Sequence, residues 1–579
     1  MLRVTTMIRS AVLRGLDVFP VEIEIGLNRS RASFGISGLG RREVQESRHR
    51  LQNALQATGY QWPEGAITVN LAPADVPKSG TALDLGIALA LLEATRQIRP
   101  ALTSPIFAIG ELGLEGAVRP IHGALQIARK IPDGSVLIGP KENNDELALL
   151  RQVPVQVRKN YTPYVVQDLG EAVNTVEAKA TPLARILAAT LESAFHAGVD
   201  FSQVIGQKRA KRALEVAAAG GHNVLLVGPP GEGKSLLAKA LPTILPNLTP
   251  AEVVELTAIY SAAGLLPSRH AWVNKRPYRV VHHTTSRQAL VGGGTGFPLP
   301  GEITLAHRGV LFLDELPEFG RTLLETLRQP LEDGFIHLRR TGGAARYPCE
   351  LILVAAMNPC PCARDGEAIC KRCEYRLSVD EPQCPRCGSG DRRSLCTCTE
   401  HEKRAYKGRL SGAIMDRIDL KVRVGALSPE ERFASPNGED SRTIRHRVQA
   451  AREIQARRYS GTNILVNARI PGGLVRQYCE LHPSAEATMR QVAVRVPELT
   501  TRGHDKLLKT ARTVADLNNS PVIYKKHIVE AAELCGHETV RDFLLSLEEM
   551  DICPSCKGPV DARHRYCPGC GYVLRAVQV

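Results

Sequence analysis

The sequence lacks any run of 18 or more apolar residues, and its first residues contain no apolar segment that leads to a small-residue cleavage site. The first absence argues against a membrane-spanning helix and the second against a secretory signal. We therefore expect a cytoplasmic protein with no membrane partner. Its 579 residues, 43% hydrophobic and 23% charged, are enough for about three or four globular domains.

The sequence also lacks the cysteine pattern of a disulfide-stabilised protein. Its 15 cysteines fall mostly into CxxC and CxC pairs, which in a cytoplasmic chain are typical of zinc sites. Two sets of four share one spacing, with ten residues between the CxxC pairs, and each set completes a tetrahedral site that leaves no position open for catalysis. We predict two structural zinc ions, bound by Cys370, Cys373, Cys384 and Cys387 and by Cys553, Cys556, Cys567 and Cys570.

The remaining cysteines divide into two groups. Two CxC pairs bracket the first four-cysteine set and predict a further zinc site, with reduced thiols as the alternative and His401 as a substitute ligand. Three isolated cysteines are expected in the hydrophobic core. The bracketing pairs are Cys360, Cys362, Cys396 and Cys398, and the isolated residues are Cys349, Cys479 and Cys535.

A phosphate-binding motif follows the apolar run Val224–Val227, which predicts a buried parallel strand. The next eight residues fit GxxxxGK[ST] and lead into a helix, so backbone N–H groups and the positive helix end converge on phosphate oxygens. Lys234 can reach the terminal phosphates, and the Ser235 hydroxyl can bind Mg²⁺. The predicted nucleotide-binding residues are Gly228, Pro229, Pro230, Gly231, Glu232, Gly233, Lys234 and Ser235.

Two further strand ends carry the residues that hydrolysis requires. The run Val310–Leu313 ends in Asp314 and Glu315. We expect Asp314 to hold Mg²⁺ through water and Glu315 to polarise the attacking water. Asn358 follows the next apolar strand, where its amide could hold that water; a simple turn before proline is the alternative. Together with the phosphate-binding motif, these residues predict an ATPase.

Two long segments of the chain read HHTTSRQALVGGGTGFPLPGEITLAHRGVLFLDELPEF and RLSGAIMDRIDLKVRV. They resemble the ComM/YifB family and the Mg-chelatase ATPase subunits, and FSQVIGQ is similar to the segment that opens AAA+ modules. It implies that Arg417 is an arginine finger donated to a neighbouring subunit and that Arg502 is the sensor 2 arginine. Guanidinium groups suit both roles because they neutralise charge on γ-phosphate oxygens. A shared site in turn implies a ring, which we expect to be a hexamer.

The front of the chain resembles the Lon-protease-type domain of the same family. PADVPKSGTALDLGIALALL and IGELGLEGAVRPIHGALQIA carry this resemblance. Aligned on the turns of that family, Ala82 occupies the position of the catalytic serine and Leu125 that of the lysine. Neither side chain can act as nucleophile or base. We therefore expect a scaffold or oligomerisation domain without peptidase activity.

Two segments of the ATPase are expected to face its substrate. His282–Gly301 is rich in glycine, threonine and histidine, and Phe335–Tyr347 predicts a hairpin with a basic tip. In related hexameric ATPases such loops line the central pore, so Arg339, Arg340 and Arg346 could contact DNA phosphates; a solvated turn is the alternative. The formal charge of +14 agrees with a polyanionic partner, although many basic proteins bind no nucleic acid.

The expected fold is α/β, with an AAA+ P-loop core. Its predicted parts are an inactive Lon-protease-like domain (1–170), a linker (171–200), an AAA+ core (201–465) with a zinc insertion (360–398), a helical lid (466–545) and a zinc ribbon (550–579). The resemblance implies a hexameric motor that extends branch migration during natural transformation, with single-stranded or branched DNA and recombination proteins as partners. The alternatives are a chelatase-type chaperone ATPase that acts on a protein partner and an ATP-dependent peptidase.

Overall fold

The structure is a computed structural model, and it covers most of the chain. It describes residues 2–28, 30–37, 41–74, 81–154, 159–182, 198–266, 272–294, 297–340, 343–365, 367–374, 376–377, 383–384, 386–425, 438–496, 499–546, 550–552, 555 and 559–561. Residues 183–197 of the expected linker and the four cysteines of the C-terminal ribbon lie outside these residues. Within them, no helix is both long and apolar enough to cross a membrane.

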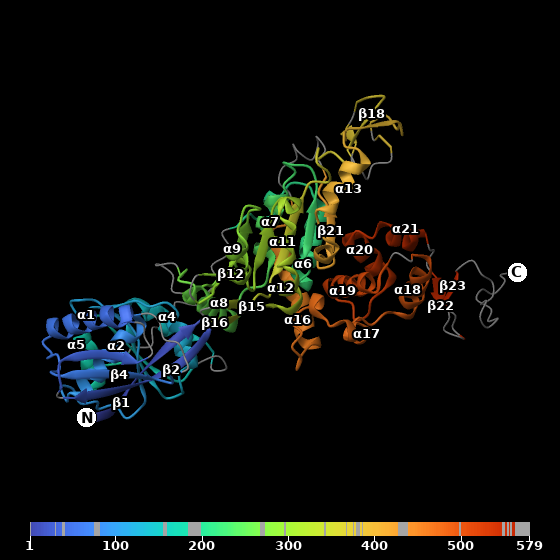
Figure 1. Cartoon of the computed structure of the whole chain (residues 1–579). Helices are drawn as coiled ribbons and strands as arrows, with labels where there is room; N and C mark the ends of the chain where they lie inside the picture. Colours follow the sequence, from blue (N-terminus) through green and yellow to red (C-terminus); the bar gives the residue numbers. More distant parts are fainter. Residues whose placement is uncertain are drawn as a thin grey trace.

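The front domain is built on a seven-stranded mixed sheet with the order β3-β4-β2-β1-β5-β8-β9 (Figure 1). Buried side chains alternate along β2, as in a strand with one face in the core. The strands are β1 (Leu2–Arg14), β2 (Asp17–Asn28), β3 (Ser33–Ser37), β4 (Ala66–Ala72), β5 (Ile106–Ala108), β8 (Val136–Pro140) and β9 (Thr162–Val166), with the small pair β6 (Glu111–Leu112) and β7 (Val118–Arg119) beside them. The helices are α1 (Arg41–Ala57), α2 (Asp84–Ala94), α3 (Ala124–Lys130), α4 (Asn144–Gln152) and α5 (Leu169–Val176).

The central domain contains the five-stranded sheet β11-β14-β17-β10-β21, in which every pair of neighbours is parallel. Parallel strands present their carboxyl ends at one edge of the sheet, and ligands bind there. The α/β fold with parallel strands is confirmed. The strands are β10 (Val224–Val227), β11 (Tyr278–Val281), β14 (Val310–Leu313), β17 (Ile352–Met357) and β21 (Leu420–Arg423). The helices are α6 (Lys208–Gly220), α7 (Lys234–Ala240), α8 (Pro250–Ala262), α9 (Arg287–Val291), α10 (Glu302–Leu305), α11 (Arg321–Glu325), α12 (Arg328–Asp333), α13 (Glu400–Gly408) and α14 (Gly412–Met415).

Three small β units are inserted into this domain. The short strands β12 (Gly292–Gly293) and β13 (Leu299–Pro300) pair with each other. The strands β15 (Phe335–Arg340) and β16 (Gly343–Pro348) form the predicted hairpin. The third unit consists of β18 (Ala368–Cys370), β19 (Arg376–Leu377) and β20 (Arg392–Ser394), and it projects away from the parallel sheet beyond α13 (Figure 1). The predicted zinc insertion therefore forms an arm.

The C-terminal helical domain has its own hydrophobic core. The elements are α16 (Ser441–Arg458), which leads to the domain, α17 (Val475–Tyr478), α18 (Pro483–Arg495), α19 (Thr501–Leu517), α20 (Lys525–Cys535) and α21 (Glu538–Ser546), followed by the strand pair β22 (Met550–Ile552) and β23 (Pro559–Asp561).

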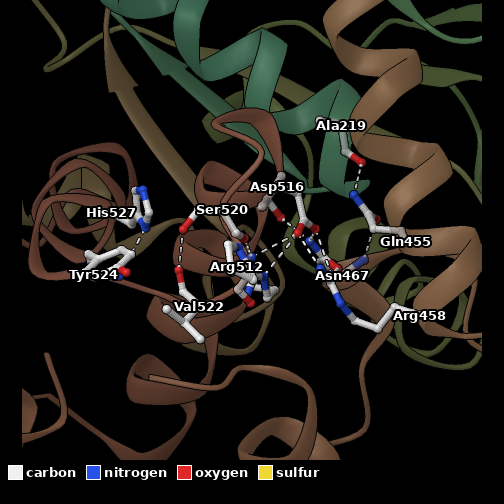
Figure 2. Close-up of polar contacts among 12 residues, drawn as sticks. Ala219, Gln455, Arg458, Asn467, Arg512, Asp516, Ser520, Val522, Tyr524 and His527 are labelled. Carbon is white, nitrogen blue, oxygen red and sulfur yellow. Dashed lines mark hydrogen bonds and ion pairs between the residues drawn. The ribbon is translucent and has the colours of Figure 1, made fainter. Parts of the chain in front are cut away.

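A buried polar network joins α16 to α19 (Figure 2). Asp516 is fully buried and accepts hydrogen bonds from Arg458, Asn467 and Arg512. Gln455 extends the network to the central domain by donating to the Ala219 carbonyl, 3.0 Å away. Because buried carboxylates are costly without partners, this network fixes the junction between the two domains.

The front domain packs against α8 of the central domain. A single hydrophobic cluster contains Leu125 of the front domain together with Val253, Val254 and Ala258 of α8. The Ser261 hydroxyl at the end of α8 accepts a hydrogen bond of 2.8 Å from the N–H group of Gly123. The front domain is therefore joined to the ATPase by apolar packing and by polar contacts.

Candidate nucleotide-binding site

The loop between β10 and α7 has the shape that its glycines allow. Gly231 and Gly233 have φ angles of 80° and 86°, in the left-handed region that glycine adopts without strain. A Cβ atom on Gly228 would lie 2.2 Å from the Val424 carbonyl oxygen, so only glycine fits against β21. Gln207, in the segment that opens this domain, donates to the Glu232 carbonyl at 3.5 Å and to that of Gly425 at 2.7 Å.

Lys234 brings the loop and the end of β17 together. Its ammonium group donates to the carbonyls of Gly228 and Pro229 at 2.6 and 2.7 Å and to the Asn358 side-chain oxygen at 3.2 Å. Burial lowers the pKa of Lys234, although neighbouring carboxylates, above all Asp314, oppose this shift. The lysine and the amide predicted from separate motifs are therefore direct neighbours at one site.

Ser235 and Asp314 also meet at this edge of the sheet. The Ser235 hydroxyl donates to the Asp314 carboxylate at 3.0 Å. A hydroxyl and a carboxylate are the oxygen ligands that Mg²⁺ prefers, beside phosphate and water. These residues therefore fit a Mg²⁺ ion bound to a nucleotide on the loop.

Glu315 has a partner that the sequence analysis missed. The backbone of Glu315 is in the left-handed region, with φ of 54°, and its carboxylate lies 3.4 Å from Nδ1 of His283. His283 follows β11, the strand beside β14 in the sheet. The signal for this contact is the His-His pair directly after a strand, at the start of the segment His282–Gly301 that is expected to face the substrate.

The polar contacts of Arg417 and Arg502 involve no residue of the phosphate-binding loop. The Arg417 guanidinium donates to the Ala413 carbonyl at 2.8 Å and pairs with Glu332, which leaves its side chain 9% exposed. Arg502 is at the beginning of α19, and its guanidinium lies 3.6 Å from the carboxylate of Asp416. The structure therefore brings the two candidate arginines near each other, and these contacts involve no residue of the loop.

Eight cysteines of the arm form two compact groups. In each group the four sulfur atoms lie within 4.8 Å of one another, and the closest pairs are 3.3–3.7 Å apart. A tetrahedral zinc site with bonds of about 2.3 Å places its sulfur atoms about 3.8 Å apart, so both groups fit zinc. The groups are Cys360, Cys362, Cys396 and Cys398, and Cys370, Cys373, Cys384 and Cys387.

The surroundings of one thiol favour the metal-binding thiolate. Although desolvation acts against ionisation, hydrogen bonds from the backbone N–H groups of Arg364 and Thr397 lower the pKa of Cys362 to about 5. His401 belongs to neither group. The three isolated cysteines, Cys349, Cys479 and Cys535, are buried as expected.

The front domain places apolar groups at the two positions aligned with a peptidase dyad. Leu125 is fully buried, and Ala82 packs against the same hydrophobic cluster, which includes α8. The N–H group of Leu125 donates to the buried carboxylate of Glu146 at 2.8 Å. The side chains at both positions therefore contribute to packing, and neither offers a nucleophile.

The β15–β16 hairpin presents arginines to solvent. Arg339 and Arg340 are exposed beside its tip, and the Arg346 guanidinium lies over the ring of Phe335, 3.7 Å from its centroid. Side chains alternate between the two faces of the hairpin, and the register places Arg339 and Arg346 on one face and Arg340 on the other. These arginines provide positive charge for a polyanion.

Three family models match the chain in succession. The model described as subunit ChlI of Mg-chelatase matches residues 21–143, and the one described as magnesium chelatase, subunit ChlI, matches 200–383 and 379–432. A third, described as the C-terminal part of magnesium chelatase subunit ChlI, matches residues 438–534. The matches include both the phosphate-binding loop and the C-terminal helical domain.

Two relatives are similar over nearly the whole chain. The uncharacterized protein YifB of Escherichia coli is 37% identical over 541 residues, which cover 93% of this chain and 97% of YifB. The competence protein ComM of Haemophilus influenzae is 35% identical over 544 residues, covering 93% and 98%. The magnesium-chelatase 38 kDa subunit of Cereibacter sphaeroides is 27% identical over 175 residues, 28% of this chain and 52% of that subunit. The chain therefore belongs to the ComM/YifB family of Mg-chelatase-like AAA+ proteins.

Proposed function

We propose that this protein is an ATP-hydrolysing ring motor that acts on DNA during recombination.

 A single observation carries the proposal: residues that follow three separate strands meet in two hydrogen-bonded pairs, Lys234 with Asn358 and Ser235 with Asp314, and the two pairs are joined by the adjacent positions of Lys234 and Ser235 in the chain. This is the arrangement that nucleotide hydrolysis requires, because phosphoryl transfer depends on positioning and on charge neutralisation.

Each residue of the site has a role in this proposal. Lys234 binds the terminal phosphates, and Ser235 and Asp314 hold Mg²⁺, which neutralises charge on the phosphate oxygens. Glu315 polarises the attacking water, and Asn358 orients it. His283 lies beside the Glu315 carboxylate, with Nδ1 3.4 Å from it.

We propose that the site is completed by a neighbouring subunit in a hexameric ring. Arg417 and Arg502 lie near each other but contact no residue of their own phosphate-binding loop, so together they suit the nucleotide of another subunit. The C-terminal helical domain acts as the lid. The front domain, with its Lon-protease-like resemblance and no dyad, acts as a scaffold.

Mixing two inactive variants tests whether the site is shared. We expect Lys234→Ala to abolish nucleotide binding and Arg417→Ala to abolish hydrolysis. In a randomly mixed ring, about a quarter of the sites combine an intact loop with an intact arginine from the neighbour. The measurement is the ATPase rate of the 1:1 mixture, which should recover toward that fraction; a mixture as inactive as its components would contradict a shared site.

DNA is the proposed substrate for two reasons. The exposed arginines of the β15–β16 hairpin suit phosphate groups irrespective of sequence. The relative named competence protein ComM is similar over 93% of this chain, whereas the magnesium-chelatase subunit is similar over 28%. We therefore favour branch migration or unwinding during natural transformation over the remodelling of a protein partner.

The ATPase rate measured with different DNA substrates tests this proposal. We expect single-stranded or branched DNA to stimulate hydrolysis at least about fivefold, and the stimulation to fade as salt is raised, because binding releases counterions. Replacing Arg339 and Arg340 by alanine should reduce the stimulation. The matched control replaces Arg476 and Arg490, two exposed arginines of the helical domain. An ATPase rate that is unchanged by every DNA substrate would favour a protein partner instead.

Zinc analysis tests the role proposed for the cysteines. We expect about two to three zinc ions per chain, because each group of four thiolates closes one structural site. Replacing Cys370 and Cys384 by serine should remove one ion, measured by elemental analysis of the purified protein. Cys349→Ser is the control, since this buried cysteine lies outside both groups. A zinc content near zero would refute the assignment.

A further inference from the structure

Helix α19 carries a row of polar residues on one face. Arg502, Lys506, Lys509 and Thr513 follow one another at intervals of four, three and four residues, and these intervals keep side chains on the same side of a helix. The row faces the segment Asp416–Asp419, which includes Arg417.

The first half of the row contacts this segment directly. The Lys506 ammonium group donates to the Ile418 carbonyl at 3.0 Å, and Arg502 lies 3.6 Å from the carboxylate of Asp416. The latter pair is mostly exposed and weak. Lys506 is half-buried, and its hydrogen bond to a backbone carbonyl is charge-assisted and therefore stronger. The two contacts hold the residues on either side of the candidate arginine finger.

The second half of the row reaches the same segment through a histidine. Thr513 Oγ1 lies 2.8 Å from Nε2 of the buried His222, whose Nδ1 is 3.6 Å from the Asp419 carboxylate. Asn223, the next residue after His222, donates its side-chain N–H to the Arg417 carbonyl at 2.8 Å. Helix α19 is thus connected to the segment at both of its halves.

The helix itself is held firmly. Asp516, one turn beyond Thr513, is fully buried and bound to Arg458 of α16 and to Asn467 (Figure 2). A displacement of α19 therefore moves the row as a unit, and the backbone of Asp416–Asp419 must follow it or lose its hydrogen bonds.

We propose that Lys506 is a positioning residue that acts through the Ile418 carbonyl on Arg417. The lid of one subunit then sets the position of the arginine that this subunit presents to the nucleotide of its neighbour. The inference rests on the shared site proposed above and adds its regulation: a movement of the lid in one subunit changes hydrolysis in the next.

The test compares Lys506→Met with Lys526→Met. Both variants remove one lysine charge from the helical domain, but Lys526 is exposed on α20. Each substitution is introduced into Lys234→Ala, and each double variant is mixed with Arg417→Ala. In these mixtures hydrolysis depends on the arginine that the double variant donates. We expect Lys506→Met to lower the recovered rate at least about tenfold and Lys526→Met to leave it unchanged.

Three further measurements separate this role from a structural one. Lys506→Met alone should bind a fluorescent ATP analogue with wild-type affinity while its kcat falls, and Lys506→Arg should restore much of the rate because it keeps a donor. If the mixture of the Lys234→Ala/Lys506→Met double variant with Arg417→Ala hydrolysed ATP as fast as the mixture of Lys234→Ala with Arg417→Ala, the inference would be overturned and the shared site would stand. If Lys234→Ala without a substitution at Lys506 also failed to restore hydrolysis in the mixture with Arg417→Ala, the shared site would be overturned, and the inference with it.

Discussion

Glu315→Gln should bind ATP with the affinity of the wild type and hydrolyse it about 10²- to 10⁴-fold more slowly, the range that a general base contributes. Glutamine keeps the size of the side chain but cannot accept a proton from water. The phosphate contacts do not depend on Glu315, because they come from the loop and from Lys234. The measurements are the steady-state ATPase rate and the affinity for a fluorescent ATP analogue.

Glu318→Gln is the matched control for this variant. Glu318 lies three residues further along the same turn, but it is about half exposed and pairs with Arg409 at 2.8 Å. We expect its loss to leave the rate close to that of the wild type, since exposed pairs contribute little. Wild-type hydrolysis by Glu315→Gln would remove this residue from the proposed role, and equal losses in the two variants would point to a disturbed turn.

Motifs with local causes could be predicted from the sequence. The loop Gly228–Ser235 depends on glycines and on the strand and helix that flank it, so its place between β10 and α7 follows from the sequence itself. The same holds for the β15–β16 hairpin and for the cysteines of the arm, whose CxxC and CxC pairs are typical of zinc sites. These features need no knowledge of the remaining fold.

Contacts between distant segments could not be predicted. His283 and Glu315 meet because β11 and β14 are neighbours in the sheet, and strand order is not encoded in either motif. Likewise, Lys506 lies 88 residues from Ile418 in the chain. Helical periodicity indicates which face of α19 is polar, but only the packing of the helical domain determines what that face contacts.

Asp516→Ala should destabilise the junction between α16 and α19 by about 3–5 kcal/mol, the cost of breaking a buried ion pair. The substitution leaves Arg512, which is 1% exposed, without its carboxylate and removes the acceptor for Arg458 and Asn467 (Figure 2). A chain with several domains does not unfold in one step, so the measurement is hydrogen exchange of the α19 amides.

The control for Asp516 is the loss of a similar pair on the surface of the same domain. Glu486 and Arg490 on α18 are also four residues apart and lie within 2.8 Å, but their side chains are 53% and 80% exposed. Glu486→Ala should therefore change the free energy of hydrogen-exchange protection of the α19 amides by less than about 0.5 kcal/mol. Similar losses in both variants would show that burial does not set the strength of the pair. A large loss for Asp516 alone would mean that the row on α19 depends on this anchor, so Asp516→Ala should also weaken the hold of Lys506 on the segment that carries Arg417.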